Sequence, residues 1–175
     1  MIVLIVGDFG VGKDTVVDML IKESLKHNDC QKFQKILSYC TREPRYEGEE
    51  THIFVSKDEF KKYNDFIAYT IIDGEYYGAR KSQFDPSKVN LYCVDDKGVQ
   101  DVVSSHIQDD IFVVEVIRPK WLIDLPKERL NRKRYFDHDS YHTDYRIIND
   151  GDLLKLQALV EDCFDFLIKE LKKSL

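Results

Sequence analysis

The feature that most constrains the fold of this chain lies at its start, where a short apolar run leads into a glycine-rich turn and then into a helical pattern. Residues 2–6 are all apolar and rich in β-branched side chains, which predicts a strand buried on both faces, as in a parallel sheet. Residues 7–12 are rich in glycine, and from Lys13 to about His27 apolar residues recur at helical spacing. This order of strand, glycine turn and helix predicts an α/β fold.

The glycine-rich turn nearly matches the phosphate-binding pattern G-x-x-x-x-G-K-[ST]. Glycines let the backbone wrap closely around an anion, so that successive N–H groups and the helix dipole face phosphate oxygens. The pattern departs at Asp14, which cannot donate to phosphate and is better suited to hold a water on Mg²⁺, so we expect Thr15 to supply the hydroxyl. The expected ATP-binding residues of this loop are Gly7, Gly10, Val11, Gly12, Lys13, Asp14 and Thr15.

Further apolar runs at 90–94, 111–117 and 145–148 alternate with helical patterns at about 97–106, about 122–141 and about 151–172. The alternation predicts a parallel sheet flanked by helices. Asp95 ends one of these runs, where folds with such a phosphate loop place a carboxylate that orders a metal ion through water. A simple turn residue is the alternative at Asp95. Thr15 and Asp95 together form the expected metal site.

The segment 36–78 differs from the rest of the chain. It has short strand patterns at 36–41, 52–55 and 66–72, and Ser56 and Glu59 form a capping box for a short helix over 56–63. Arg42 and Arg45 flank a proline in its charged loop. Two guanidiniums on a stiffened loop suit a phosphate dianion, although a solvated charged loop is the alternative. We expect an insertion here rather than an independent domain.

The run from Ser38 to Phe60, SYCTREPRYEGEETHIFVSKDEF, resembles the acceptor-binding segment of the guanylate kinase family, S-x-x-T-R-x-P-R-x-G-E. Likewise GEYYG at 74–78, VDDKG at 94–98 and DYRIIND at 144–150 resemble the family's G-N-x-Y-G, I-D-x-Q-G and D-Y-x-I-V-N-D, so the similarity covers nearly the whole chain. It implies one P-loop kinase domain over 1–175, with its core at 1–35 and 80–175, an inserted acceptor-binding lobe at 36–79 and a short lid at about 118–134.

The resemblance also implies an activity: phosphoryl transfer that depends on ATP and Mg²⁺, to a small phosphorylated acceptor that is most simply a nucleoside monophosphate. Lys13 and a lid arginine, Arg129 or Arg118, would stabilise charge on the transferred group, with Arg132 and Arg134 as alternatives. Asn149 would lie near the donor adenine. The acceptor-binding residues that the resemblance implies are Ser38, Arg42, Arg45, His52, Tyr77 and Asp95.

Three departures from the family pattern concern the acceptor. Ala68 and Ala79 stand where the family reads guanine with a glutamate and a serine or threonine, and His52 stands at a phosphate-binding tyrosine. The side chains of two alanines cannot form hydrogen bonds with the edge of guanine, so the identity of the acceptor is left undecided. The G-K-D-[ST] and His-Ile features also resemble ribose 1,5-bisphosphate phosphokinases, and G-K-D-T occurs in some phage deoxynucleotide kinases. A non-catalytic guanylate-kinase-like binding module is a further alternative, although such modules typically lack an intact phosphate loop.

Composition narrows the classes of partner. A net charge of −6 and a pI near 5.4 argue against nucleic-acid binding. No apolar run approaches the length of about 18 residues that predicts a membrane span. The four cysteines form no CxxC pair, which predicts small buried side chains in a reducing compartment. We expect a cytoplasmic protein that binds ATP and a small acceptor, and neither nucleic acid nor membrane. The choice between monomer and homodimer stays open.

Overall fold

The computed structural model describes residues 1–27, 32–105, 107, 110–123 and 137–173 of the chain. Strands and helices alternate along the first and last parts of these residues, and short strands gather in the middle. In chain order the elements are β1 (Ile2–Val6), α1 (Lys13–Ser24), β2 (Phe33–Ile36), β3 (Tyr39–Cys40), β4 (Ile53–Phe54), α2 (Lys57–Phe60), β5 (Phe66–Ile72), β6 (Glu75–Arg80), the 3₁₀ turn η1 (Lys81–Gln83), β7 (Val89–Cys93), α3 (Asp96–Ser104), β8 (Ile111–Ile117), the 3₁₀ turn η2 (Lys120–Leu122), β9 (Tyr145–Ile148) and α5 (Leu153–Lys173).

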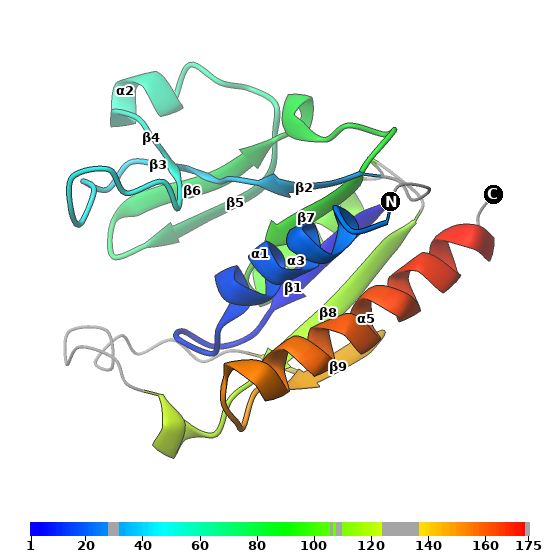
Figure 1. Ribbon diagram of the computed structural model, residues 1–175. Helices are drawn as coiled ribbons and strands as arrows, with labels where there is room; N and C mark the ends of the chain where they lie inside the picture. Colours follow the sequence, from blue (N-terminus) through cyan, green and yellow to red (C-terminus); the bar gives the residue numbers. More distant parts are fainter. Residues whose placement is uncertain (28–31, 106, 108–109, 124–136, 174–175) are drawn as a thin grey trace.

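The core is a five-stranded sheet of order β2-β7-β1-β8-β9, in which every neighbouring pair is parallel. The β1 side chains are fully buried, because helices cover both faces of the sheet. Val3 and Ile5 pack with α1 and α5 on one face, and Ile2, Leu4 and Val6 pack with α3 on the other (Figure 1). This is the predicted α/β architecture. No described helix has an apolar stretch long enough to cross a bilayer.

Residues 39–80 build a second, four-stranded sheet of order β4-β3-β6-β5 beside the core, and we call these residues the inserted lobe (Figure 1). β6 is antiparallel to both β3 and β5, and β4 runs parallel to β3. The core helix α3 contacts the lobe, since the Lys97 ammonium donates to the Tyr69 carbonyl at 3.0 Å. The lobe thus stands over the end of the sheet where Asp95 begins α3.

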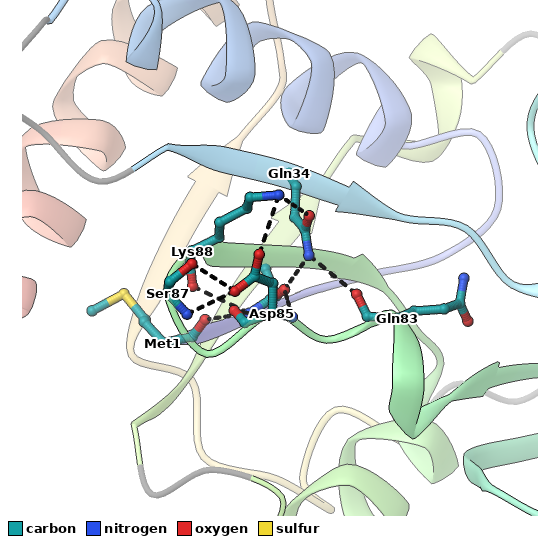
Figure 2. Close-up of polar contacts among 7 residues, drawn as sticks. Met1, Gln34, Gln83, Asp85, Ser87 and Lys88 are labelled. Atoms are coloured by element: carbon teal, nitrogen blue, oxygen red, sulfur yellow. Dashed lines mark hydrogen bonds and ion pairs between the residues drawn. The ribbon is translucent and has the colours of Figure 1, made fainter.

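A network of polar side chains joins the two segments through which the chain enters and leaves the lobe, and ties both to the core (Figure 2). Asn90, which is fully buried, donates from Nδ2 to the carbonyls of Asp85 at 2.8 Å and of Met1 at 3.2 Å. Its Oδ1 accepts from Gln34 Nε2 at 2.6 Å. Gln83 Nε2 donates to the Leu37 carbonyl at 2.8 Å. These contacts join β2, which leads into the lobe, to the segment that returns from it.

Two parts of the predicted secondary structure are wrong. The helix expected over 122–141 is absent from residues 137–141, which form turns, while 124–136 lie outside the described residues. Polar contacts hold these turn residues instead: His138 Nδ1 donates to Glu115 Oε1 of β8 at 2.6 Å, and Ser140 Oγ donates to the Asp137 carbonyl at 2.8 Å. The sequence patterns also missed β6 and the core strand β2, because neither carries a continuous apolar run.

Candidate active site

The turn between β1 and α1 has the backbone that a phosphate loop needs. Gly7, Gly10 and Gly12 have φ angles of 142°, 76° and 102°, which residues other than glycine rarely adopt. A Cβ on Gly7 would also lie 2.2 Å from the Val116 carbonyl oxygen. The Lys13 ammonium donates to the carbonyls of Gly7 at 2.7 Å and Asp8 at 2.8 Å. Lys13 therefore lies inside the turn, where its charge faces any anion that the loop holds.

Asn149, directly after β9, supports this loop from the other side. Its side chain is buried, and Nδ2 donates to the Val11 carbonyl at 2.8 Å. A Cβ on Gly12 would lie 2.9 Å from that nitrogen. Val11 itself is buried in the core under the loop, so what it offers a nucleotide is its backbone. Asn149, expected near the donor adenine, is thus in direct contact with the backbone of the phosphate loop.

Oxygen ligands suitable for Mg²⁺ lie on both sides of the loop. The Thr15 hydroxyl group and the Asp95 carboxylate are hard donors that fit this ion, and both residues line the same cavity. Asp95 caps α3, where Oδ1 accepts from Gly98 N at 2.5 Å. Asp14 is exposed and pairs with Lys35 at 3.1 Å. The described residues hold no group of three or more His, Cys, Asp or Glu side chains, so an ion at Thr15 and Asp95 would complete its shell with phosphate and water.

A cavity of about 410 Å³ extends from the phosphate loop into the inserted lobe. It brings the loop residues together with side chains from three other parts of the chain. The predicted site residues that line it are Gly7, Gly10, Gly12, Lys13, Asp14, Thr15, Ser38, Arg45, His52, Tyr77 and Asp95. Arg42 is not among the lining residues. The cavity therefore joins the residues predicted to bind donor phosphates to those predicted to bind an acceptor, and we call the part lined by Arg45, His52 and Tyr77 the acceptor end.

The acceptor end is organised by a buried carboxylate, Glu49. Its oxygens accept from the Arg42 guanidinium at 2.6 and 2.9 Å, from Arg45 N at 2.7 Å and from Thr51 Oγ1 at 2.6 Å. The hydrogen bonds from Arg42 hold the pKa of Glu49 far below its ordinary value. The Arg42 guanidinium also lies over the Phe54 ring, 5.0 Å from its centroid. Arg42 is thus neutralised and packed, whereas Arg45, with 40% of its side chain exposed, lines the cavity.

The part of the cavity wall that β5 forms with Ser38 and Tyr92 consists of apolar and hydroxyl-bearing side chains. Ala68 lines the cavity and pairs across β5 and β6 with Ala79, which is fully buried. The Ser38 and Tyr92 hydroxyl groups share a hydrogen bond of 3.1 Å, and burial raises the pKa of Tyr92. The β5 residues that line the cavity are Ala68, Tyr69, Thr70 and Ile72, so this strand offers a base no carboxylate.

A second cavity of about 410 Å³ adjoins the phosphate loop on its other side. Its lining includes Arg118, Leu122, Asn149 and Leu153, and it shares Gly10, Gly12 and Thr15 with the first cavity. The Arg118 guanidinium donates to the carbonyls of Leu122 at 3.0 Å and Asn149 at 3.3 Å. These residues fit the predicted place of the donor nucleotide. Arg129, Arg132 and Arg134 lie outside the described residues.

Sequence reasoning gave no role to Glu49 or to a second buried carboxylate, Glu115. Although burial alone would raise the pKa of Glu115, hydrogen bonds from His138 Nδ1 at 2.6 Å and Arg146 Nε at 2.7 Å lower it. These contacts fix the turn after residue 137 against β8. The available signal was a lone charged residue inside an otherwise apolar strand, since such a residue needs partners when it is buried.

Comparisons with known proteins add evidence that is independent of this geometry. A family model described as guanylate kinase matches residues 1–109. A guanylate kinase from Clostridium tetani is 35% identical over 123 residues, which are 65% of this chain and 55% of that protein. One from Clostridium acetobutylicum is 35% identical over 86 residues, 46% of this chain and 38% of that protein. The chain thus spans about half the length, or less, of these relatives.

A solved structure shares the fold. The crystal structure of guanylate kinase from Anaplasma phagocytophilum superposes with a TM-score of 0.65 and 18% sequence identity, over 99% of this chain and 85% of that one. At this identity the likeness concerns the arrangement of sheets and helices alone.

Proposed function

The chain belongs to the guanylate kinase family, and from that premise we propose that it is an ATP-dependent kinase whose acceptor is a nucleoside monophosphate. The observation that supports the proposal is the continuous cavity in which Lys13 of the phosphate loop faces Arg45, His52 and Tyr77 of the inserted lobe. Phosphoryl transfer needs two phosphates aligned in one water-excluding site. A cavity with a cationic group at each end provides for both.

In this proposal the protein contributes position and charge. The loop N–H groups and Lys13 hold the donor phosphates, and Arg118, or Arg129 outside the described residues, stabilises charge on the transferred group. Arg45, Tyr77 and His52 hold the acceptor phosphate, with Arg42 behind them. Mg²⁺ at Thr15 and Asp95 would supply charge neutralisation on the donor phosphates. An acceptor phosphate is already anionic near neutral pH, so the reaction needs no general base.

We further infer that GMP is not the strongly preferred acceptor. Ala68 and Ala79 leave the N1, N2 and O6 edge of guanine without side-chain partners from β5 and β6, and a buried polar edge without a partner costs about 1–3 kcal/mol. The arginine-rich end still favours a phosphate. Other monophosphates, deoxynucleotides among them, and ribose 1,5-bisphosphate are therefore alternative acceptors.

The test is a coupled ADP-release assay with ATP, Mg²⁺ and GMP, AMP, CMP, dTMP, UMP or ribose 1,5-bisphosphate as acceptor. We expect transfer to at least one of the six and less than about a hundredfold preference for GMP in kcat/KM. A larger preference for GMP would show that guanine contacts are rebuilt elsewhere. Absence of transfer together with absence of ATP binding would favour a non-catalytic binding module instead.

A further inference from the structure

Two buried nitrogens at the acceptor end have no hydrogen-bond partner within the described parts of the chain: Arg42 Nε and His52 Nδ1. Buried polar groups are nearly always paired, and one left unpaired costs free energy. His52 lines the central cavity beside Arg45, Thr51 and Tyr77. The ring of His52 is thus part of the wall of a candidate ligand cavity, and it carries a buried nitrogen whose hydrogen-bonding capacity is unused among the described residues.

The imidazole of His52 is held in place by its neighbours. It meets the Phe54 ring edge-on at 6.0 Å between centroids and the Tyr77 ring at 5.5 Å. Its backbone leads directly into β4, where Ile53 N donates to the Ser38 carbonyl at 2.9 Å. The ring therefore presents its nitrogens in a fixed place rather than sampling the cavity.

Charges of both signs act on this ring from every side. Burial and then the Arg42 guanidinium lower the pKa of His52 to about 4, with a smaller contribution from Arg45. Asp14 of α1 and Glu49 act in the opposite direction, but Glu49 is already shared by both arginines. The aromatic rings in contact with the imidazole, Phe54 of β4 and Tyr77 of β6, add no carboxylate or ammonium group. At pH 7 the imidazole is therefore neutral.

A bound phosphate dianion would reverse this balance, because it outweighs the excess positive charge of the two arginines over Glu49. We propose that His52 takes up one proton from solvent as the acceptor's phosphate dianion binds, and that the resulting imidazolium pairs with the phosphate. The inference rests on the proposed function. The step forms one N–H bond, and the proton comes from the buffer. His52 thereby becomes a residue that selects a doubly charged phosphate.

The sign of the pH dependence follows from this step. Because the imidazolium is stabilised only in the complex, acceptor affinity rises as pH falls through the pKa of His52 in the complex. The gain ends near pH 6, where the phosphate monoester itself takes up a proton. A clamp of arginines alone would show no such rise, since arginine stays charged throughout.

Calorimetry tests the proton uptake directly. Each of the six phosphorylated compounds named above is titrated at pH 7.0 into the protein, in two buffers with different enthalpies of ionisation. For those that bind, we expect the parent protein to take up about half a proton or more. His52→Gln, whose amide can donate but cannot be protonated, should take up close to none. His142→Gln is the matched control, because His142 is 87% exposed in its side chain, and it should behave as the parent does.

Proton NMR of the imidazole Cε1–H gives a second readout that does not depend on a variant's folding, since the titration is followed in the parent protein. The His52 signal should titrate below pH 5 in the free protein and at about pH 7 or above in the complex. A midpoint that stays below about pH 7 in the complex, while ATP phosphorylates the same compound, would overturn the inference and leave the proposed function standing. If none of the six compounds bound, both the inference about His52 and the proposed function would be contradicted.

Discussion

The arrangement around Glu49 shows how single residues set the charge of the acceptor end. Glu49 is fully buried in its side chain and receives hydrogen bonds from Arg42, Thr51 and the Arg45 backbone. Two arginines without this carboxylate would repel each other across a short loop. With it, Arg42 is fixed, and Arg45 is left to face the cavity.

Arg42→Ala is expected to weaken acceptor binding and to destabilise the lobe. Acceptor affinity should fall by roughly 1.5–3 kcal/mol, because the loss of Arg42 leaves Glu49 as a poorly compensated negative charge behind the cavity wall. The KM for ATP should change little. Unfolding stability should fall by up to about 3 kcal/mol, because Glu49 loses its main partner. Steady-state kinetics and urea unfolding measure the two effects. Glu47→Ala, an exposed change in the same loop, is the control, and an equal loss of ATP and acceptor affinity in Arg42→Ala would place this arginine at the donor site.

Lys13→Ala is expected to reduce kcat by about 10²–10³, since the ammonium acts where charge develops during transfer. Its two hydrogen bonds are to the loop's own carbonyls, so the fold should survive, with an unchanged circular dichroism spectrum. Lys22→Ala, near the end of the same helix, should keep full activity. Activity of Lys13→Ala within a few-fold of the parent would refute the assignment of the donor site.

At the scale of elements, the inserted lobe is held to the core by side-chain amides where the chain enters and leaves it, and by the packing of Ala68 and Ala79 in one apolar cluster with β1 and α3. Asn90 alone bonds the carbonyls of Met1, Asp85 and Lys88 and accepts from Gln34 and Asp85 N. On the other side of the lobe, α3 contributes Lys97 and Asp101 to the Tyr69 backbone. The lobe is thus oriented by polar contacts of defined geometry.

Asn90→Ala should therefore destabilise the protein by about 2–4 kcal/mol, because it leaves several buried backbone groups unpaired at once. Urea unfolding gives the value, with Asn64→Ala as an exposed control in the lobe. A change below about 0.5 kcal/mol, the size usual for surface substitutions, would show that water replaces the amide without loss.

At the scale of the whole molecule, the sequence predicted the core well where a buried strand is an almost uninterrupted run of apolar residues. The limits of β8 and β9 were predicted to the residue, since their apolar runs end at polar or turn residues. β2 and β6 were not predicted, because their side chains are stabilised by partners distant in sequence, such as Asn90 opposite Gln34. The same holds within the site: the loop glycines and Arg45 could be read from local patterns, whereas the pairing of Arg42 with Glu49 depends on how the loop folds back.

The pH dependence of stability should also reflect His52. Its pKa of about 4 in the folded protein, against 6.5 in the unfolded chain, means that the unfolded state binds more protons between these values. Stability should thus be nearly full above pH 6.5 and decrease by about 2–3 kcal/mol on acidification to pH 4.5. Carboxylates such as Glu49, with lowered pKa values, add their losses below about pH 4.5. His52→Gln should flatten the upper part of this profile in urea unfolding, and an unchanged slope in that variant would contradict the assignment.

The pairing of β2 with β7, described above as the place where the lobe leaves and rejoins the core, has a consequence for how such a chain can vary. The two strands lie side by side with the entire lobe between them in sequence, so the sheet closes a long loop. The entropy of closing a loop grows only with the logarithm of its length, and a doubling costs about 0.6 kcal/mol. Insertions and deletions in the lobe are therefore cheap for the core, and the acceptor end can change its shape and chemistry while the phosphate loop stays as it is.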